Sequence, residues 1–112
     1  MKKIEAIIRN EKLVYVRAAL KAANMQGITV YHVLGKGQQK DLILRSKGET
    51  IEVDLLPKTK IELFVDDDDI DKVVDIIKKS ACSANIGDGK IIILPIDNVI
   101  RIRTGEQGKN AI

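Results

Sequence analysis

An internal repeat constrains the fold of this chain more than any other feature of its sequence. Residues 3–5, Lys-Ile-Glu, recur as residues 60–62, which lie 57 positions later. A helix-like stretch repeats with the same offset. A constant offset through one strand-like and one helix-like stretch indicates a duplicated β-α-β unit. The repeated apolar positions of the helix-like stretch are Leu13, Val16 and Leu20, which correspond to Ile70, Val73 and Ile77.

Each copy predicts a strand, a helix and a second strand. In the first copy the strands are residues 3–9 and the β-branched residues 28–34. The helix between them is expected to extend from Asn10, a residue type that suits an N-cap, to about Met25. This order, repeated, predicts an α+β, ferredoxin-like βαββαβ fold. In the second copy the strands are residues 60–65 and 91–96, with a helix through 70–77.

The length of 112 residues fits one domain, residues 1–112, with helices on one face of an antiparallel sheet. The strands carry too many apolar positions for the other face to remain exposed to water, so we expect an oligomer. Two segments lie outside the repeat. Residues 36–57 form a connection far longer than an ordinary hairpin loop of roughly two to five residues. Residues 97–112 form a C-terminal segment.

A short motif in the last third of the chain points to an anion. In residues 86–90, Ile-Gly-Asp-Gly-Lys, two glycines allow backbone N–H groups to approach an anion, and a lysine adjoins them. Arg101 and Arg103 follow at positions i and i+2, so an extended backbone would present both from one face. Together these residues predict a polyphosphate site. The alternative is an ordinary Gly-Asp-Gly turn before a strand, whereas a Walker A loop does not fit because Lys90 is followed by Ile91.

Composition argues against several classes of function. The net charge is only +3, and with no Trp, one Phe and two Tyr the chain lacks the aromatic residues with which an RNA-binding sheet stacks bases, so nucleic acid is not an expected partner. No apolar run reaches the roughly 18 residues of a membrane-spanning helix, so direct membrane insertion is not expected. The single Cys82 excludes an intrachain disulfide and suits the cytoplasm. Without a Cys/His pair or a general-base dyad, we expect a binding protein and not an enzyme.

Several further stretches resemble the PII family of nitrogen-regulatory signal-transduction proteins over essentially the full chain. Residues 35–40, Gly-Lys-Gly-Gln-Gln-Lys, and residues 54–62 resemble the start and the exit of the family's long T-loop. Residues 83–91 resemble the signature T-G-x-I-G-D-G-K-I, and residues 99–106 with 111–112 resemble the family's C-terminus. The motifs occur in the family's order and at its spacing.

The resemblance implies a homotrimer that binds ATP or ADP in each cleft between subunits. By position, residues 87–90 would hold the phosphates, and Arg101 and Arg103 would reach them from the adjoining subunit. Thr29 and Phe64 lie where the family contacts the adenine end. The implied nucleotide-binding residues are Thr29, Gly37, Gln38, Phe64, Gly87, Asp88, Gly89, Lys90, Arg101 and Arg103.

The resemblance also implies 2-oxoglutarate and Mg²⁺ as ligands. The 2-oxoglutarate positions are Arg9, Gln39, Lys40 and Lys58, and Gln39 would also bind Mg²⁺ through the bound ATP and 2-oxoglutarate. ATP with these ligands would favour one T-loop state and ADP another. The loop would then bind or release a partner, which in the family is an ammonium transporter, glutamine synthetase or a transcription regulator. A cytoplasmic protein that associates with a membrane through a transporter is expected.

The chain departs from the family's pattern within the T-loop. Ile51 stands at the position of a modifiable tyrosine, and because it has no nucleophilic oxygen we expect no covalent modification there. Lys47 replaces an arginine that contacts a transporter, so it keeps the charge without the bidentate fork. Gln38 replaces a phosphate-contacting arginine, and Asp41 adds a carboxylate beside the site of a dianion. Two alternatives follow: an adenylate-only sensor that has lost 2-oxoglutarate binding, and a weak ATP hydrolase on the same fold.

Overall fold

The computed structural model describes residues 1–25, 27–37, 42–46 and 48–112. Within these residues, four strands form an antiparallel sheet in the order β2-β5-β1-β6, and two further strands form a separate hairpin, β3-β4. The elements are β1 (Lys2–Ile8), α1 (Leu13–Ala22), β2 (Thr29–Gly35), β3 (Leu42–Ser46), β4 (Glu49–Val53), β5 (Leu56–Val65), α2 (Ile70–Ala81) and β6 (Lys90–Pro95). The predictions for Gln38, Gln39, Lys40, Asp41 and Lys47 concern positions outside the described residues.

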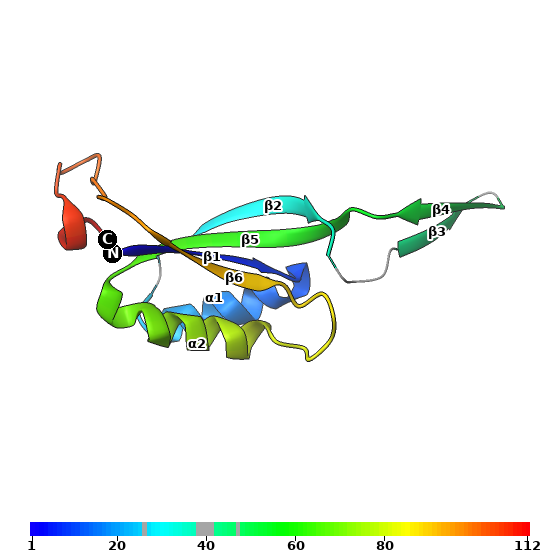
Figure 1. Cartoon of the computed structure of the whole chain (residues 1–112), viewed down its shortest axis with the longest axis horizontal. Helices are drawn as coiled ribbons and strands as arrows, with labels where there is room; N and C mark the ends of the chain where they lie inside the picture. Colours follow the sequence, from blue (N-terminus) through cyan, green and yellow to red (C-terminus); the bar gives the residue numbers. More distant parts are fainter. Residues whose placement is uncertain (26, 38–41, 47) are drawn as a thin grey trace.

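The predicted α+β, ferredoxin-like βαββαβ fold is confirmed. Both helices lie on the same side of the four-stranded sheet, as Figure 1 shows. The first strands of the two repeats, β1 and β5, are the central pair, and their register places Glu5 opposite Glu62. The repeat in the sequence is therefore a repeat in space, with equivalent strands side by side at the centre of the sheet.

Alternate residues of the central strands and one stripe of each helix form the core. Val16 of α1 and Val73 of α2, which are equivalent positions of the repeat, are both fully buried. Each large apolar side chain buried in this way stabilises the fold by about 1.5–3 kcal/mol relative to exposure. The strand residues that pack against this stripe are Ile4, Ala6 and Ile8 of β1 and Ile61, Leu63 and Val65 of β5.

The start of α1 differs from the expectation. A 3-10 turn, Asn10–Lys12, precedes the helix, and the equivalent turn Asp67–Asp69 precedes α2. The expected N-cap role of Asn10 is wrong, because its Oδ1 accepts a hydrogen bond of 2.7 Å from Thr59 Oγ1. Thr59 is 1% exposed, so its hydroxyl needs a partner inside the fold, and the Asn10 side chain satisfies it instead of the helix.

The end of α1 also comes earlier than predicted. The helix ends at Ala22 and not at about Met25. Asn24 adopts a left-handed backbone conformation with a φ of 63°, a conformation that ends helices and that asparagine tolerates better than most residues. The Met25 N–H then donates to the Leu20 carbonyl at 2.8 Å, which satisfies one of the last helical acceptors.

The face of the sheet opposite the helices carries a network of charges. Lys3 Nζ lies 3.2 Å from Glu5 Oε1, and Lys60 Nζ lies between Glu5 and Glu62, at 3.8 and 3.5 Å from their Oε1 atoms. The hydrogen bond from Lys3 holds the pKa of Glu5 below its ordinary value. Lys60 also lies over the Tyr31 ring, 4.8 Å from its centroid. This face therefore combines neutralised charges with partly exposed aromatic surface.

The long connection contains a β-hairpin, which we call the arm (β3 and β4). Arg45 pairs with Thr50 near its tip, and Figure 1 shows the arm extending beyond the end of the main sheet. The strand that follows starts earlier than the predicted residues 60–65: β5 begins at Leu56, and Leu56 pairs with Gly35 of β2. The root of the arm is thus part of the main sheet.

Candidate functional site

The anion motif lies in the loop between α2 and β6, which we call the glycine loop (residues 82–89). Gly87 and Gly89 have φ angles of 101° and 97°, which only glycine adopts readily. A Cβ atom on Gly89 would lie 1.6 Å from the Ile7 carbonyl oxygen. Gly89 is therefore required by its close approach to β1, whether or not the loop binds a ligand.

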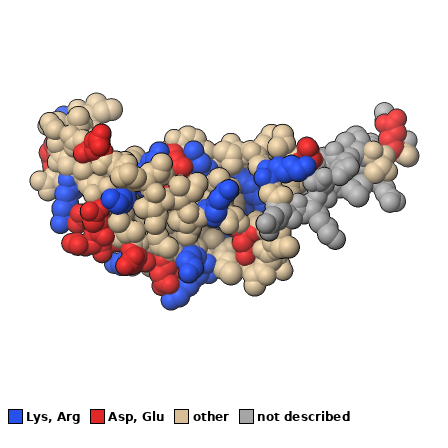
Figure 2. Space-filling model, in the orientation of Figure 1, with Lys and Arg blue, Asp and Glu red and all other residues tan. Residues whose placement is uncertain are grey.

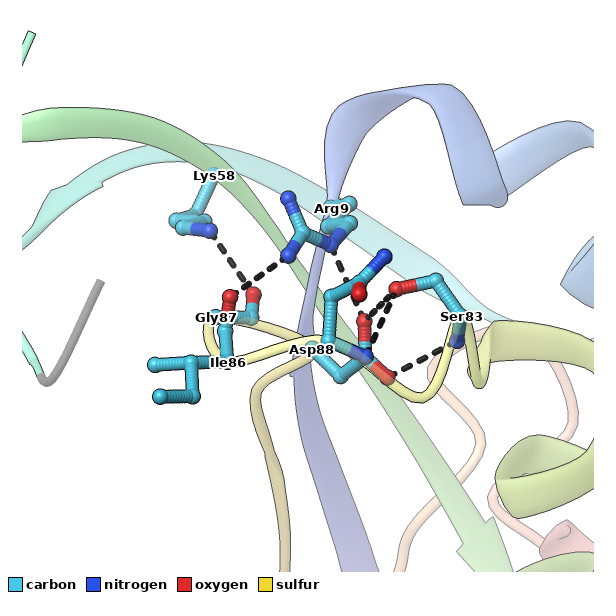
Figure 3. A network of polar contacts seen from close by, with 7 residues as sticks. Arg9, Lys58, Ser83, Ile86, Gly87 and Asp88 are labelled. Atoms are coloured by element: carbon cyan, nitrogen blue, oxygen red, sulfur yellow. Dashed lines mark hydrogen bonds and ion pairs between the residues drawn. The ribbon is translucent and has the colours of Figure 1, made fainter. Parts of the chain in front are cut away.

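The Asp88 carboxylate holds the glycine loop together from inside (Figure 3). Its Oδ2 accepts a hydrogen bond of 2.8 Å from the Ser83 backbone N–H, and its Oδ1 accepts from the Ser83 hydroxyl and, at 2.9 Å, from Arg9 Nε. The Ser83 hydroxyl and the Arg9 guanidinium hold the pKa of Asp88 well below its ordinary range. The Asp88 carboxylate is thus kept ionised at neutral pH and faces these partners.

Two cations outside the loop bind its carbonyl groups. Arg9, just after β1, donates from Nη2 to the Ile86 carbonyl at 2.7 Å, and Lys58 of β5 donates to the Gly87 carbonyl at 2.9 Å. Partial burial and the neighbouring Arg9 charge lower the pKa of Lys58. An arriving anion would relieve this repulsion between the two cations.

The glycine loop and the root of the arm enclose a pocket of about 590 Å³. Residues 35–37 and residues 85–90 contribute most of its lining. Three lysines line it, namely Lys36, Lys58 and Lys90, which lie next to or within three different strands. A pocket of this size that combines lysines with glycine backbone suits a small polyanion.

The other predicted nucleotide-binding residues lie at the opposite end of the folded molecule. Thr29 and Phe64 line a separate pocket of about 410 Å³ together with Val99 and the terminal residues 111–112. Thr29 begins β2 and Gly35 ends it, and a seven-residue strand spans about 20 Å. The structure therefore brings Gly37, Gly87, Asp88, Gly89 and Lys90 together but separates them from Thr29 and Phe64.

Arg101 and Arg103 lie in a tight turn and not in the extended segment that the sequence suggested. The Gly105 N–H donates to the Arg101 carbonyl at 2.8 Å, and the Arg101 N–H donates to the Glu106 carbonyl at 2.9 Å. Gly105 has a φ of 73°, which closes the turn. Both arginine side chains are exposed, and Figure 1 places this segment far from the glycine loop.

The turn that precedes α2 forms ion pairs with residues at both ends of the chain. The Met1 amine lies 2.8 Å from Asp67 Oδ1, and Lys109 Nζ lies 3.0 Å from Asp66 Oδ2. Figure 2 shows acidic side chains gathered at this end of the molecule. Residues 66–69 thus form a solvated acidic turn that binds the chain's own cations.

The structure adds residues that the sequence left unassigned. Ser83 and Lys36 belong to the glycine loop and its pocket, and the only signal for Ser83 was its place inside the signature motif. Among the described residues, no group of three or more His, Cys, Asp or Glu side chains is arranged to hold a metal ion. In that same part of the chain, no helix is both long and apolar enough to cross a membrane.

Comparison with known proteins gives consistent matches over the whole chain. Residues 1–106 match the family model described as "Nitrogen regulatory protein P-II". The chain is 54% identical over 112 residues to "Nitrogen regulatory protein P-II 2" of Methanothermobacter thermautotrophicus, a match that covers 100% of this chain and 97% of that protein. It is 49% identical to the proteins named "Nitrogen regulatory protein P-II" of Nostoc punctiforme and Synechocystis sp., with both chains of each pair fully covered.

Proposed function

Because the chain belongs to the PII family of nitrogen regulatory proteins, we propose that it senses ATP and ADP at clefts between the subunits of a homotrimer. The observation that carries this proposal is the division of the nucleotide residues into two groups at opposite ends of one chain. A single molecule cannot bring these groups around one nucleotide. A neighbouring copy can, because its far end can lie against the glycine loop.

One half of each cleft would be the pocket of the glycine loop. The backbone of Gly37, Gly87 and Gly89 and the Lys90 side chain would bind the phosphates, since successive backbone N–H groups can form an anion-binding concavity. Asp88 has a different role in this proposal, since its carboxylate is already bonded to Arg9 and Ser83. It would hold the loop in shape while the backbone contacts the ligand.

The neighbouring subunit would supply the other half. Its Arg101 and Arg103 would bind the phosphates, and its Thr29 and Phe64 would contact the adenine end. A contact between two different ends of identical chains is heterologous, and repeated around a threefold axis it closes into a ring. The division of residues suggests such a contact between copies, and the number of three subunits is what the family resemblance implies.

2-Oxoglutarate would bind beside the phosphates. Arg9 and Lys58 form a pair of neighbouring cations whose mutual repulsion a dicarboxylate would relieve. Mg²⁺ would be held mainly by ligand oxygens, as is common for this ion, with Gln39 as its protein donor; when bound, it would neutralise phosphate charge. The alternative of an adenylate-only sensor is supported by Arg9, which already donates to Asp88 and to the Ile86 carbonyl.

The arm would transmit the ligand state to a partner in nitrogen metabolism. Residues 35–37 belong both to the pocket and to the root of the arm, so a ligand that prefers one arrangement of the root shifts the arm. The proposed partners are an ammonium transporter, contacted through Lys47, and glutamine synthetase or a transcription regulator. Control would come from ligands alone, without modification at Ile51, in a cytoplasmic protein that does not turn ATP over.

Calorimetric titration tests the ligands directly. The purified protein should bind ATP with Mg²⁺, and the ATP-loaded form should then bind 2-oxoglutarate. Lys58→Met should abolish the second signal and leave the first within a few-fold, because it removes one cation of the dicarboxylate site. ATP binding without a 2-oxoglutarate signal in the unaltered protein would leave the adenylate-only sensor, and absence of any nucleotide binding would refute the proposal.

Mixing two variants tests whether each site is shared between subunits. Lys90→Ala and Arg101→Ala should each abolish ATP binding when they are the only subunit present. When the two variants are unfolded together in equal amounts and refolded, about a quarter of the clefts should pair an intact Lys90 with an intact Arg101 from the neighbour. Calorimetric stoichiometry measures this recovery. No recovery in mixed trimers would mean that both residues serve a site within one chain.

A further inference from the structure

The segment that carries the two arginines is a small hairpin built around one side chain. We call residues 98–108 the C-terminal hairpin. Asn98 Oδ1 accepts hydrogen bonds from the Val99 N–H at 2.9 Å and from the Gly108 N–H at 3.0 Å. Its Nδ2 donates to Gln107 Oε1 at 2.9 Å. The Asn98 carboxamide therefore links the two legs of the hairpin at its open end.

Backbone contacts also hold the two legs together. The Gly108 N–H donates to the Val99 carbonyl at 3.0 Å, and Ile100 and Gln107 form an isolated bridge. An exposed two-legged hairpin of this length is only marginally stable in water, so each additional link between the legs changes its population. The conformation of the tip depends on the legs, because the Arg101 N–H can donate to the Glu106 carbonyl only when the two legs are in register.

We propose that Asn98 is a positioning residue that sets the direction of Arg101 and Arg103 toward the phosphates bound in the neighbouring subunit's glycine loop. The inference rests on the proposed function and adds to it a residue that touches no ligand. Without the carboxamide, the legs lose the two hydrogen bonds that it makes to Gln107 and Gly108, and the arginines at the tip sample more directions. Affinity for a polyphosphate then falls, because only the competent fraction binds.

The chemistry of the position explains why an amide is suited to it. The Asn98 oxygen accepts from the Val99 N–H and shares the Gly108 N–H with the Val99 carbonyl, and Gln107 offers an amide that can present either its oxygen or its nitrogen. An aspartate keeps the acceptor for both N–H groups, and the Gln107 amide can turn to donate to it. An alanine provides neither. Asn98→Asp therefore keeps the acceptor for the backbone, and Asn98→Ala removes it.

Lys109 offers a matched control beside the hairpin. Its ammonium joins the segment to Asp66 at 3.0 Å, but its side chain is 71% exposed, and an ion pair that exposed contributes little. Lys109→Ala removes a contact between the segment and the body of the protein without touching the link between the legs. It should leave the direction of the arginines unchanged.

The experiment compares the full-length chain with four variants: Asn98→Ala, Asn98→Asp, Lys109→Ala and Arg101→Ala. Calorimetry gives the Kd of ATP with Mg²⁺, and hydrogen exchange reports the amides of residues 99–108. Asn98→Ala should weaken ATP binding about tenfold and speed exchange in the hairpin, with an unchanged unfolding midpoint and oligomer mass. Asn98→Asp and Lys109→Ala should stay within about twofold of the unaltered chain.

Three results would overturn the inference. In the first, Asn98→Ala binds ATP as the unaltered chain does while Arg101→Ala loses binding. In the second, Asn98→Asp is as weak as Asn98→Ala, or Lys109→Ala is equally weak. In the third, Asn98→Ala lowers the unfolding midpoint together with the affinity for ATP, which assigns Asn98 a general structural role. Absence of ATP binding by the unaltered chain refutes the proposed function as well, which distinguishes that failure from the other three.

Discussion

Replacing Gly89 with alanine should lower the free energy of unfolding by about 3 kcal/mol or more. The new Cβ would lie 1.6 Å from the Ile7 carbonyl oxygen and 2.7 Å from its carbon, so the glycine loop could not close against β1. The φ of 97° adds backbone strain for any residue with a Cβ. Urea denaturation followed by circular dichroism measures the change.

Gly27→Ala is the matched control for this prediction. A Cβ at Gly27 meets nothing within 4 Å, and the backbone there does not have a positive φ that disfavours alanine. Its unfolding free energy should change by less than about 1 kcal/mol, with a small gain expected from the less flexible unfolded chain. If Gly89→Ala unfolded at the same urea concentration as Gly27→Ala, the close approach to β1 would not be a constraint on this loop.

Replacing Asp88 with asparagine should lower stability by about 2 kcal/mol at neutral pH and remove part of its acid dependence. The substitution leaves the Arg9 guanidinium, whose side chain is only 16% exposed, without its ion-pair partner. The pKa of Asp88 is lowered in the folded state, so its contribution is complete above the ordinary value of 3.8. That contribution is lost progressively as the pH falls below 3.8 toward the folded-state pKa.

Unfolding midpoints measured between about pH 7 and pH 2 test this sign. The unaltered chain should lose stability more steeply below pH 4 than Asp88→Asn does. Asp75→Asn is the control, because Asp75 pairs with Lys79 at 2.9 Å on the exposed side of α2 and should contribute less than about 0.5 kcal/mol. If the unfolding midpoints of the unaltered chain and of Asp88→Asn fell equally steeply below pH 4, the Asp88 carboxylate would not stabilise the fold.

The repeat made the fold predictable because packing depends on periodic apolar positions. Val16 and Val73 are equivalent in the sequence and both are fully buried, so the spacing of the apolar residues was enough to predict which face of each helix packs into the core. Element ends were less predictable. Asn10 is a favourable N-cap by type, but a buried hydroxyl from Thr59, 49 positions away, competes for its oxygen. No local pattern reveals such a partner.

The site was predictable to the same extent. The conformation of the glycine loop was predictable from Gly87 and Gly89, because their positive φ angles favour glycine at each position. The role of Asp88 was hidden, since its partner Arg9 is 79 positions away and meets it only in the folded sheet. The extended segment assumed for Arg101 and Arg103 failed for a local reason: Gly105 closes a turn that alternating residues alone do not signal.

The position of the pocket makes the arm and the bound ligand thermodynamic partners. Residues 35–37 and Leu56 form the root of the arm and also line the pocket of the glycine loop. If a ligand in this pocket favours one arrangement of the arm, then that ligand and a partner bound to the arm change each other's dissociation constants by one common factor. A partner that prefers the arm of the ligand-filled form would raise the affinity for that ligand by the same factor, so the partner would help to set the ligand concentration to which the protein responds.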